Sequence, residues 1–278
     1  MEERISWSSM LLSCFKDPSL RPLAVNWSAA MGLQDVDGME PSPFLQKLAR
    51  ETLEGTLSLD AAQQQLTRYY QSWLHKKESI QRFREADFAA LRIVMLLQDR
   101  RFTFSPDQLL SIHRQLFSGI LPHAGQIRDY NITKEEWVLQ GETVFYAPCE
   151  TIARSLQNLF TWERQFSCQG LSRQDYIRHL AEFTAHLWQI HAFGEGNTRT
   201  TALFLMKYLE ARGFRLCKQV FMKNAWYFRN ALVRANFRNP MLGVENDRVY
   251  LENFLDTLLY GTPHTMKNEH LHIGYGHP

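Results

Sequence analysis

The sequence lacks any apolar run close to the roughly 20 residues that a helix needs to cross a bilayer. Its opening segment carries two acidic side chains and a short apolar run broken by serines, which makes a poor secretory signal. The formal net charge of +2 over 278 residues is too small to indicate a general nucleic-acid or anionic membrane surface. We therefore expect a cytoplasmic protein, or one delivered from the cytoplasm to another cell, without nucleic-acid or membrane partners.

The cysteine and histidine motifs of metal sites are also missing. The cysteines, Cys14, Cys149, Cys168 and Cys217, lie far apart and form no CxxC pair, so the sequence predicts neither a zinc site nor a disulfide framework. Four free thiols in a protein of this size fit a reducing compartment. The HExxH motif of zinc proteases is absent as well.

What the chain does contain is the composition and the periodicity of a globular, mainly α protein. Hydrophobic residues make up 45% and charged residues 22%, enough to bury a core in one large domain or two unequal ones. Helical spacing of apolar side chains predicts helices over 43–54, 58–73, 83–97, 105–118, 150–166, 172–190, 198–212, 224–236 and 250–260.

The same pattern divides the chain into three parts. A helical N-terminal region (1–74) is either a small cap or a regulatory module, a larger domain follows (75–261), and the tail (262–278) is polar and is expected to be loose. Residues 122 to 148 alone have strand-like patterning. Two short segments there, 127–132 and 143–146, are rich in β-branched and aromatic residues and predict a small β-hairpin or an extended flap.

The stretch from His191 to Arg199, which reads HAFGEGNTR, joins two predicted helices and concentrates reactive side chains. Glycines let the loop turn sharply and approach a ligand closely, and backbone N–H groups at the start of the second helix form an anion site. Asn197 adds a donor, and Arg199 can hold a phosphate through two parallel hydrogen bonds.

Glu195 is unusual in an anion site unless a cation is bound too, and a carboxylate beside a polyphosphate suits Mg²⁺. His191 can accept a proton near neutral pH. Together these groups indicate attack by a hydroxyl on a phosphoanhydride. Each residue alone has a plainer explanation: a helix cap, a solvated charge, a salt-bridge partner. The functional interpretation rests on their joint spacing.

HAFGEGNTR resembles the signature of Fic-domain proteins, HxFx(D/E)(G/A)N(G/K)R, and Thr198 takes the slot that is normally glycine or lysine. Upstream, Gly125 to Arg128 (GQIR) resembles the family's G-x-[IV]-R segment, and Leu139 to Tyr146 resembles the flap with which members align a target segment by strand pairing. The resemblance covers roughly residues 80 to 260 and implies a Fic-type helical bundle with a small β-hairpin flap.

The resemblance implies transfer of AMP from Mg-ATP to a Ser, Thr or Tyr hydroxyl of a target protein. His191 would be the general base, and Glu195 would hold Mg²⁺. Nucleotide and phosphate contacts would come from Gly194, Gly196, Asn197, Thr198 and Arg199 and, in an adenine pocket, from Tyr227 and Asn230. The target would dock on Thr143, Val144, Phe145 and Tyr146.

Some positions depart from the family's pattern. Ala202 stands where many members have a second arginine, so the outer phosphates would be held less firmly. The N-terminal region resembles the antitoxin-type inhibitory module fused to or partnering such domains, whose helix bears [S/T]xxxE[G/N]. When the motif is aligned through Trp27, its glutamate position holds Gln34. Gln34 cannot form an ion pair with Arg199, but it can hydrogen-bond to it. We therefore expect weak or absent carboxylate-type autoinhibition.

Three alternatives stay open. The chain could be a Fic-fold transferase that uses another donor or the γ-phosphate, as the related Doc proteins do. It could be a nucleotide-binding interaction module without activity, against which the intact His191 and Glu195 argue. A metalloenzyme using His186 and His191 is the weakest alternative, because their i, i+5 spacing puts them about 140° apart on a helix.

Overall fold

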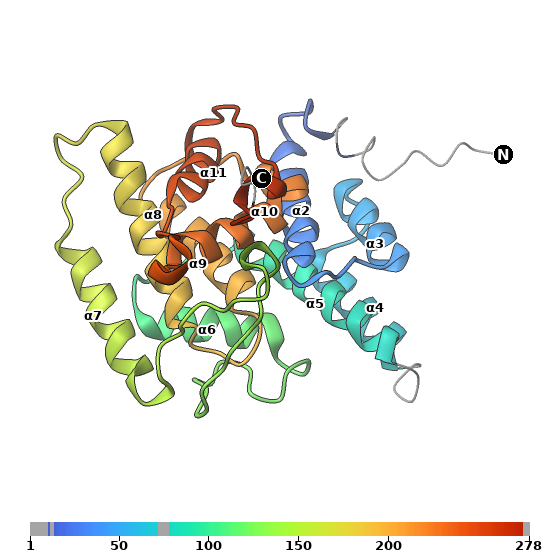
Figure 1. The fold of residues 1–278 in the computed structure, drawn as a ribbon. Helices are drawn as coiled ribbons and strands as arrows, with labels where there is room; N and C mark the ends of the chain where they lie inside the picture. Colours follow the sequence, from blue (N-terminus) through green and yellow to red (C-terminus); the bar gives the residue numbers. More distant parts are fainter. Residues whose placement is uncertain (1–10, 12–13, 72–77, 275–278) are drawn as a thin grey trace.

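The computed structural model describes Leu11, residues 14–71 and residues 78–274. Within these ranges the protein is a bundle of α-helices joined by loops and short 3-10 turns (Figure 1). The α-helices are α2 (Arg21–Gly32), α3 (Pro43–Leu53), α4 (Leu59–Gln71), α5 (Glu78–Gln98), α6 (Pro106–Phe117), α7 (Ile152–Gln165), α8 (Arg173–Ile190), α9 (Asn197–Ala211), α10 (Phe221–Asn236) and α11 (Val249–Tyr260). The predicted mainly α class is confirmed. None of the helices in these ranges has the length and apolar character of a membrane span.

Serine hydroxyls cap the first turn of α3, α6 and α8, and Ser58 caps α4 in the same way by accepting the Ala61 N–H at 3.1 Å. The hydroxyls of Ser42, Ser105 and Ser172 accept hydrogen bonds from the backbone N–H three residues on, at 3.2, 3.1 and 3.1 Å. Each bond satisfies a donor that the first helical turn leaves unpaired. Local capping therefore fixes where α3, α6 and α8 start.

The flap between α6 and α7 is extended, but the predicted β-hairpin does not form. Among the described residues of the flap, the only strand-type pairing is one isolated antiparallel bridge between Glu135 and Thr143. A 3-10 turn, Trp137–Leu139, forms its tip. The segment 127–132 contributes no strand to a hairpin because its backbone is used elsewhere: the Arg128 N–H donates to Ala192 O, in the loop after α8, at 3.0 Å.

The N-terminal region shares one hydrophobic core with the larger domain. Helix α2 packs against α5 and α10, and its Trp27 is fully buried and donates its indole N–H to Thr52 Oγ1 at 2.9 Å. Gly32 marks a close approach of backbones, since a Cβ there would lie 2.2 Å from the carbonyl oxygen of Phe221. The predicted boundary at residue 74 lies outside the described residues, and the core continues across it from α2–α4 into α5, α9 and α10.

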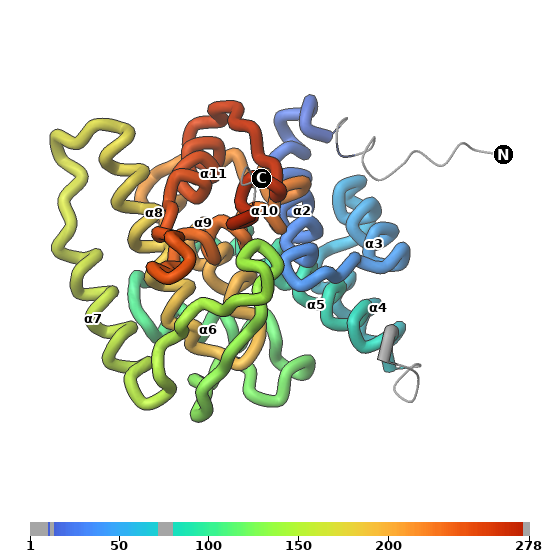
Figure 2. The backbone as a smooth tube through the Cα atoms, in the orientation of Figure 1, coloured from blue at the N-terminus to red at the C-terminus, as the bar shows by residue number. Residues whose placement is uncertain are grey.

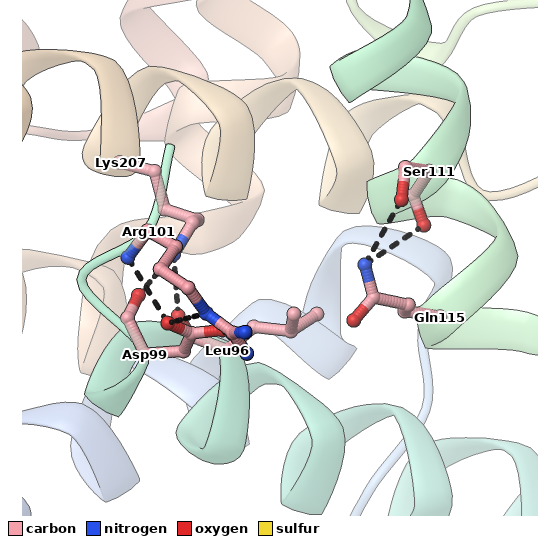
Figure 3. A network of polar contacts seen from close by, with 6 residues as sticks. All are labelled: Leu96, Asp99, Arg101, Ser111, Gln115 and Lys207. Carbon is pink, nitrogen blue, oxygen red and sulfur yellow. Dashed lines mark hydrogen bonds and ion pairs between the residues drawn. The ribbon is translucent and has the colours of Figure 1, made fainter. Parts of the chain in front are cut away.

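A buried lysine fixes α9 against the end of α5. Lys207 is 5% exposed, and its ammonium group donates to the backbone oxygens of Leu96 and Asp99 at 2.7 and 2.5 Å (Figure 3). These oxygens lie at the C-terminal end of α5, where unpaired carbonyls and the helix dipole favour a cation. The Asp99 carboxylate beside them pairs with Arg101 at 2.7 Å. The helix that follows HAFGEGNTR is thereby held against α5.

The tail packs on the body of the protein as far as residue 274, which corrects the expectation of a loose tail; residues 275–278 lie outside the described part. Its 3-10 turn, Asn268–Leu271, buries Leu271 completely. The Asn230 amide donates to Asn268 Oδ1 at 2.8 Å, and the Tyr250 hydroxyl donates to His270 O at 2.7 Å. Figure 2 shows this red segment passing close to the green flap. A buried leucine and hydrogen bonds to α10 and α11 thus help to hold a segment of polar composition against the body of the protein.

Candidate active site

His191 ends α8 and begins the loop that carries the motif. It adopts a left-handed conformation (φ 49°), which is uncommon for a residue with a side chain and turns the chain out of the helix. The side chain is 3% exposed, and its Nδ1 lies 3.3 Å from the carbonyl oxygen of Trp188. That acceptor assigns the proton to Nδ1 and leaves the lone pair on Nε2. Nε2 has no hydrogen-bond partner among the described residues.

The surroundings of His191 keep its imidazole neutral. Burial lowers the pKa of His191 well below its usual value of 6.5, and the positive charges of Lys134 and Arg128 lower it further. The ring is covered by Tyr146 from the flap, with the two ring centroids 4.0 Å apart, and meets the Trp188 ring edge-on at 5.3 Å. A neutral imidazole with a free Nε2 lone pair has the protonation state that a general base requires.

Asn197 and Thr198 use their polar groups within the protein. Asn197 Oδ1 accepts the Phe193 N–H at 3.0 Å, and its Nδ2 donates to Phe193 O at 2.7 Å, which closes the loop on itself. The Thr198 hydroxyl accepts the indole N–H of Trp188 at 3.0 Å. The side chain that replaces the family's glycine or lysine therefore packs on α8. The side chains of Asn197 and Thr198, two of the predicted phosphate contacts, thus hold the loop in its conformation.

Gly194 and Gly196 stand where a side chain has no room. A Cβ at Gly194 would lie 2.4 Å from the hydroxyl of Tyr130, and one at Gly196 would lie 2.4 Å from the ring of Phe117. Gly196 also has a φ of +73° and is the N-cap of α9. The backbone of the loop thus remains bare at the positive end of a fifteen-residue helix, where N–H groups and the helix dipole favour an anion.

Glu195 lies exposed between the two glycines. Its backbone oxygen is 3.0 Å from His113 Nε2, while its side chain reaches solvent. The described residues contain no group of three or more His, Cys, Asp or Glu that could hold a metal by itself. A single accessible carboxylate nevertheless suits Mg²⁺, which takes its other ligands from phosphate oxygens and water. Glu195 therefore fits the predicted role.

His113, on α6, contacts the motif loop and holds it in place, a role that the sequence did not predict. Its Nδ1 accepts the Gly125 N–H at 2.8 Å, so its Nε2 donates to Glu195 O, and its ring stacks on Phe193 with centroids 3.7 Å apart. Burial lowers the pKa of His113 to about 4, so the ring is neutral. A lone histidine on the apolar face of a helix gives no sequence signal for such a role.

Arg128, from the GQIR segment, ties the flap to the loop. It is 5% exposed, and its guanidinium donates to the backbone oxygens of His191, Tyr130 and Ala147 at 2.8, 2.6 and 2.5 Å. The planar, multiply donating guanidinium suits three acceptors at once. The sequence pattern singled out this arginine without a role. In the structure it holds His191 and both ends of the flap in place.

Known proteins match part of this sequence and its fold. The model of the Fic/DOC family matches residues 103–209, from the start of α6 through the flap and the motif loop into α9. The chain carries a Fic domain. It is 30% identical over 175 residues to a protein adenylyltransferase of Bartonella henselae and 30% identical over 121 residues to a probable protein adenylyltransferase of Escherichia coli. These matches take in 59% and 42% of the chain but 32% and 56% of the relatives, so the chain spans less than two thirds of either.

Solved structures agree on the fold. The N-terminal Fic domain of a VirB-translocated effector from Bartonella sp. AR 15-3 matches with a TM-score of 0.53 at 21% identity, over 68% of this chain and 86% of that one. The BepC protein from Bartonella tribocorum, solved with bound AMPPNP, matches with a TM-score of 0.51 at 20% identity, over 69% and 91%. At these identities the likeness concerns the fold alone.

Within the Fic domain, Arg199 is enclosed by partners from three segments. The side chain is 1% exposed, and its Nη2 donates to Glu85 Oε1, on α5, at 2.6 Å. Its Nε lies 2.9 Å from Asp37 Oδ2 in the geometry of an ion pair and not of a hydrogen bond. Gln34 Oε1 accepts from Nη1 at 3.3 Å, and the Phe117 ring lies 4.7 Å from the guanidinium carbon.

The hydrogen bond predicted between Gln34 and Arg199 is confirmed. Two carboxylates that the motif comparison did not consider, those of Asp37 and Glu85, also pair with this arginine, while the weak or absent autoinhibition stays a prediction. The 3-10 turn Leu33–Asp37 follows α2 directly and carries Asp37 to the guanidinium, and Glu85 arrives from the larger domain. A linear motif compares one slot of one helix. It cannot register charges that a turn or a distant helix supplies.

Helix α10 turns Tyr227 and Asn230 into the core, and their part in an adenine pocket stays a prediction. Tyr227 and Asn230 are each 1% exposed, and the Asn230 amide is bound to the tail. Their neighbours Trp226 and Arg229 line a hollow of about 500 Å³ together with the turn residues 35–38, which include Asp37. Adjacent helix positions differ by about 100°, so a shift of one residue exchanges the core face for the open face.

The four predicted docking residues of the Fic flap have different exposures. Phe145 is 81% exposed and Val144 is 2% exposed, while Thr143 and Tyr146 lie between these extremes. Gln189 of α8 donates its side-chain amide to Phe145 O at 3.1 Å, which fastens the flap to the helix that carries His191. Val144 therefore anchors this segment in the core, Tyr146 lies against His191, and Phe145 exposes its ring to solvent.

Proposed function

We propose that this Fic domain transfers AMP from Mg-ATP to a Ser, Thr or Tyr hydroxyl of a target protein. One observation carries the proposal: a buried, neutral imidazole with an unpartnered Nε2 stands at the head of a bare glycine loop that leads into the N-terminus of a helix. The relatives named as adenylyltransferases and the solved neighbour with bound AMPPNP support ATP as the donor.

In this proposal His191 Nε2 removes the proton from the target hydroxyl as the hydroxyl oxygen attacks the α-phosphorus of ATP. The new oxygen–phosphorus bond forms while the bond to the β-phosphate oxygen breaks, and pyrophosphate leaves. The Trp188 carbonyl, 3.3 Å from Nδ1, stabilises the imidazolium that results. The loop glycines and the start of α9 surround the phosphoryl oxygens with N–H groups. Mg²⁺, held by Glu195, would neutralise phosphate charge.

Two contacts of this structure must open before that reaction. His191 is 3% exposed and the Tyr146 ring lies against it, so a target hydroxyl reaches Nε2 only after neighbouring side chains move aside. Arg199 is occupied by Glu85 and Asp37, so it can hold the outer phosphates only by exchanging them for the donor. The N-terminal region, which supplies Asp37 and Gln34, therefore opposes donor binding in this proposal.

The test compares ATP labelled on the α-phosphate with ATP labelled on the γ-phosphate, each incubated with the protein, Mg²⁺ and a cell extract. Adenylylation puts only the α label on protein. Label from the γ position alone means phosphate transfer, and an absence of both labels leaves another donor or a binding module.

His191→Ala should abolish labelling. His186→Ala is the matched control, because His186 lies on the same helix but lines a separate hollow. Full labelling by the His191 variant would exclude it as the base.

A further inference from the structure

The C-terminal tail contacts the tip of the flap as well as the helical body. The Ile273 N–H donates to the carbonyl oxygen of Val138 at 2.9 Å, and the His272 ring lies against the Trp137 ring with centroids 5.2 Å apart. Val138 and its neighbour Leu139 are fully buried, so the tail holds the flap at a point where it enters the core.

The tail itself is fixed at the other end. Leu271 is fully buried, and the turn that contains it is hydrogen-bonded to Asn230 on α10 and to Tyr250 on α11. It therefore joins α10 and α11 to the flap. Its place beside the flap is visible in Figure 2, although the bonded residues Ile273 and Val138 are 135 residues apart in sequence.

The flap tip is connected to the docking residues by backbone pairing. The Glu136 N–H donates to Glu142 O at 3.0 Å, and Glu135 forms an antiparallel bridge with Thr143. Glu136 is also buried at 1% exposure and takes two hydrogen bonds from Arg229, at 2.6 and 3.0 Å. Holding the tip in place thus sets the position at which the segment from Thr143 to Tyr146 begins.

We infer that the tail, residues 262–274, is a positioning element for the target-docking flap, with the Ile273–Val138 hydrogen bond as its point of attachment. The inference rests on the proposed function for its consequence, which is the placing of a target segment, but not for the contact itself. Loss of the attachment should loosen the flap tip and weaken productive docking of the target, while the nucleotide contacts of the motif loop stay unchanged.

The test uses the full chain with Ile273→Pro, which removes the N–H donor, and Ile273→Val as the matched control, which keeps it. His272 before it already has the extended backbone (φ −68°, ψ 128°) that a following proline requires. Hydrogen exchange is measured at the flap-tip amides of Glu136, Gly141 and Glu142. We expect about tenfold faster exchange in the proline variant alone. The Arg128 amide, bound to Ala192 O at 3.0 Å, should keep its rate.

Steady-state transfer provides the second measurement. The KM for the target should rise about tenfold in Ile273→Pro, with the KM for ATP unchanged. Unchanged exchange at the flap tip would overturn the attachment, and faster exchange with an unchanged target KM would overturn the positioning role. If the wild type transfers no nucleotide, the proposed function has failed, and the exchange measurement still decides the attachment. His272→Ala, which removes the contact with Trp137 and the acceptor of the Gly274 N–H at 3.2 Å, replaces the proline variant if that variant does not fold.

Discussion

Changing Glu85 to glutamine should make the protein bind Mg-ATP more tightly and fold less stably. Glu85 is one of two carboxylates that occupy Arg199, and any phosphate that Arg199 is to hold must displace it. The change is isosteric and removes the charge from a contact of 2.6 Å between side chains that are 17% and 1% exposed. It therefore alters the competition for the guanidinium without altering its surroundings.

The size of the effect follows from burial. A hydrogen bond between charged groups contributes about 1.5–3 kcal/mol, roughly twice a neutral one, so the loss of charge at Glu85 removes about 1.5 kcal/mol of competition. That difference corresponds to about tenfold tighter binding. Asp37 is 36% exposed and lacks hydrogen-bond geometry with Arg199. Asp37→Asn should therefore tighten nucleotide binding by less than about 1 kcal/mol, or under fivefold. Because both contact Arg199, the double variant should not be additive.

The measurement is calorimetric titration with a non-hydrolysable ATP analogue and Mg²⁺, together with thermal unfolding of the free protein. Glu85→Gln leaves the buried Arg199 charge less compensated, so the unfolding midpoint should fall by roughly 4 to 8 °C, for about 2 kcal/mol. Glu182→Gln is the control, since Glu182 pairs with Arg248 at 3.2 Å away from Arg199. A lower midpoint with unchanged or weaker nucleotide binding would show that Arg199 does not hold the donor.

Three further variants and one pH profile test other parts of the site. Burial lowers the pKa of His113 in the folded protein to about 4 from 6.5, so falling pH favours the unfolded state. In urea titrations, the unfolding free energy of the wild type should therefore drop by about 2 kcal/mol more between pH 7 and 5 than that of His113→Gln. Equal drops would refute the shift in pKa. Gly32→Ala should cost about 3 kcal/mol by collision with backbone, against about 1 kcal/mol for Gly55→Ala, which meets nothing within 4 Å; equal midpoints would contradict the close approach. Arg128→Lys cannot serve three carbonyls and should lower the transfer rate at least about tenfold; a normal rate would remove its positioning role. The lowered pKa of His191 predicts a transfer rate that is flat from pH 8 to 6.5 and declines only below, so a half-maximal point above 6.5 would refute a neutral buried base.

The partners of Arg199 show which contacts a motif comparison can find and which it cannot. Gln34 was found by alignment through one tryptophan, and its hydrogen bond to Arg199 exists. Glu85 lies 114 residues before Arg199 in the chain and belongs to a helix that no inhibitory motif describes. Asp37 follows the aligned slot by three residues and comes into reach only because the chain tightens into a 3-10 turn after α2. The electrostatic character of the site depends on all three.

Other differences have the same origin. The sequence predicted a strand at 127–132 because β-branched and aromatic residues favour extended backbone, but the chain bends at residues 129 and 130. Its N–H at Arg128 pairs with the motif loop instead of a hairpin partner. Tyr227 and Asn230 lie on the expected helix, but the packing of α10 turns them inward and brings Trp226 and Arg229 to the hollow.

By itself, the sequence determined the mainly α class, most helix positions and the nine residues from His191 to Arg199. Those features depend on helical periodicity, serine caps and glycines, all of which act within a few residues along the chain. Only the tertiary structure decided the free Nε2 of His191, the two carboxylates on Arg199, the three carbonyls served by Arg128 and the attachment of the tail to the flap. These are contacts between segments far apart in sequence, and side-chain direction and burial, which packing sets, select which groups meet.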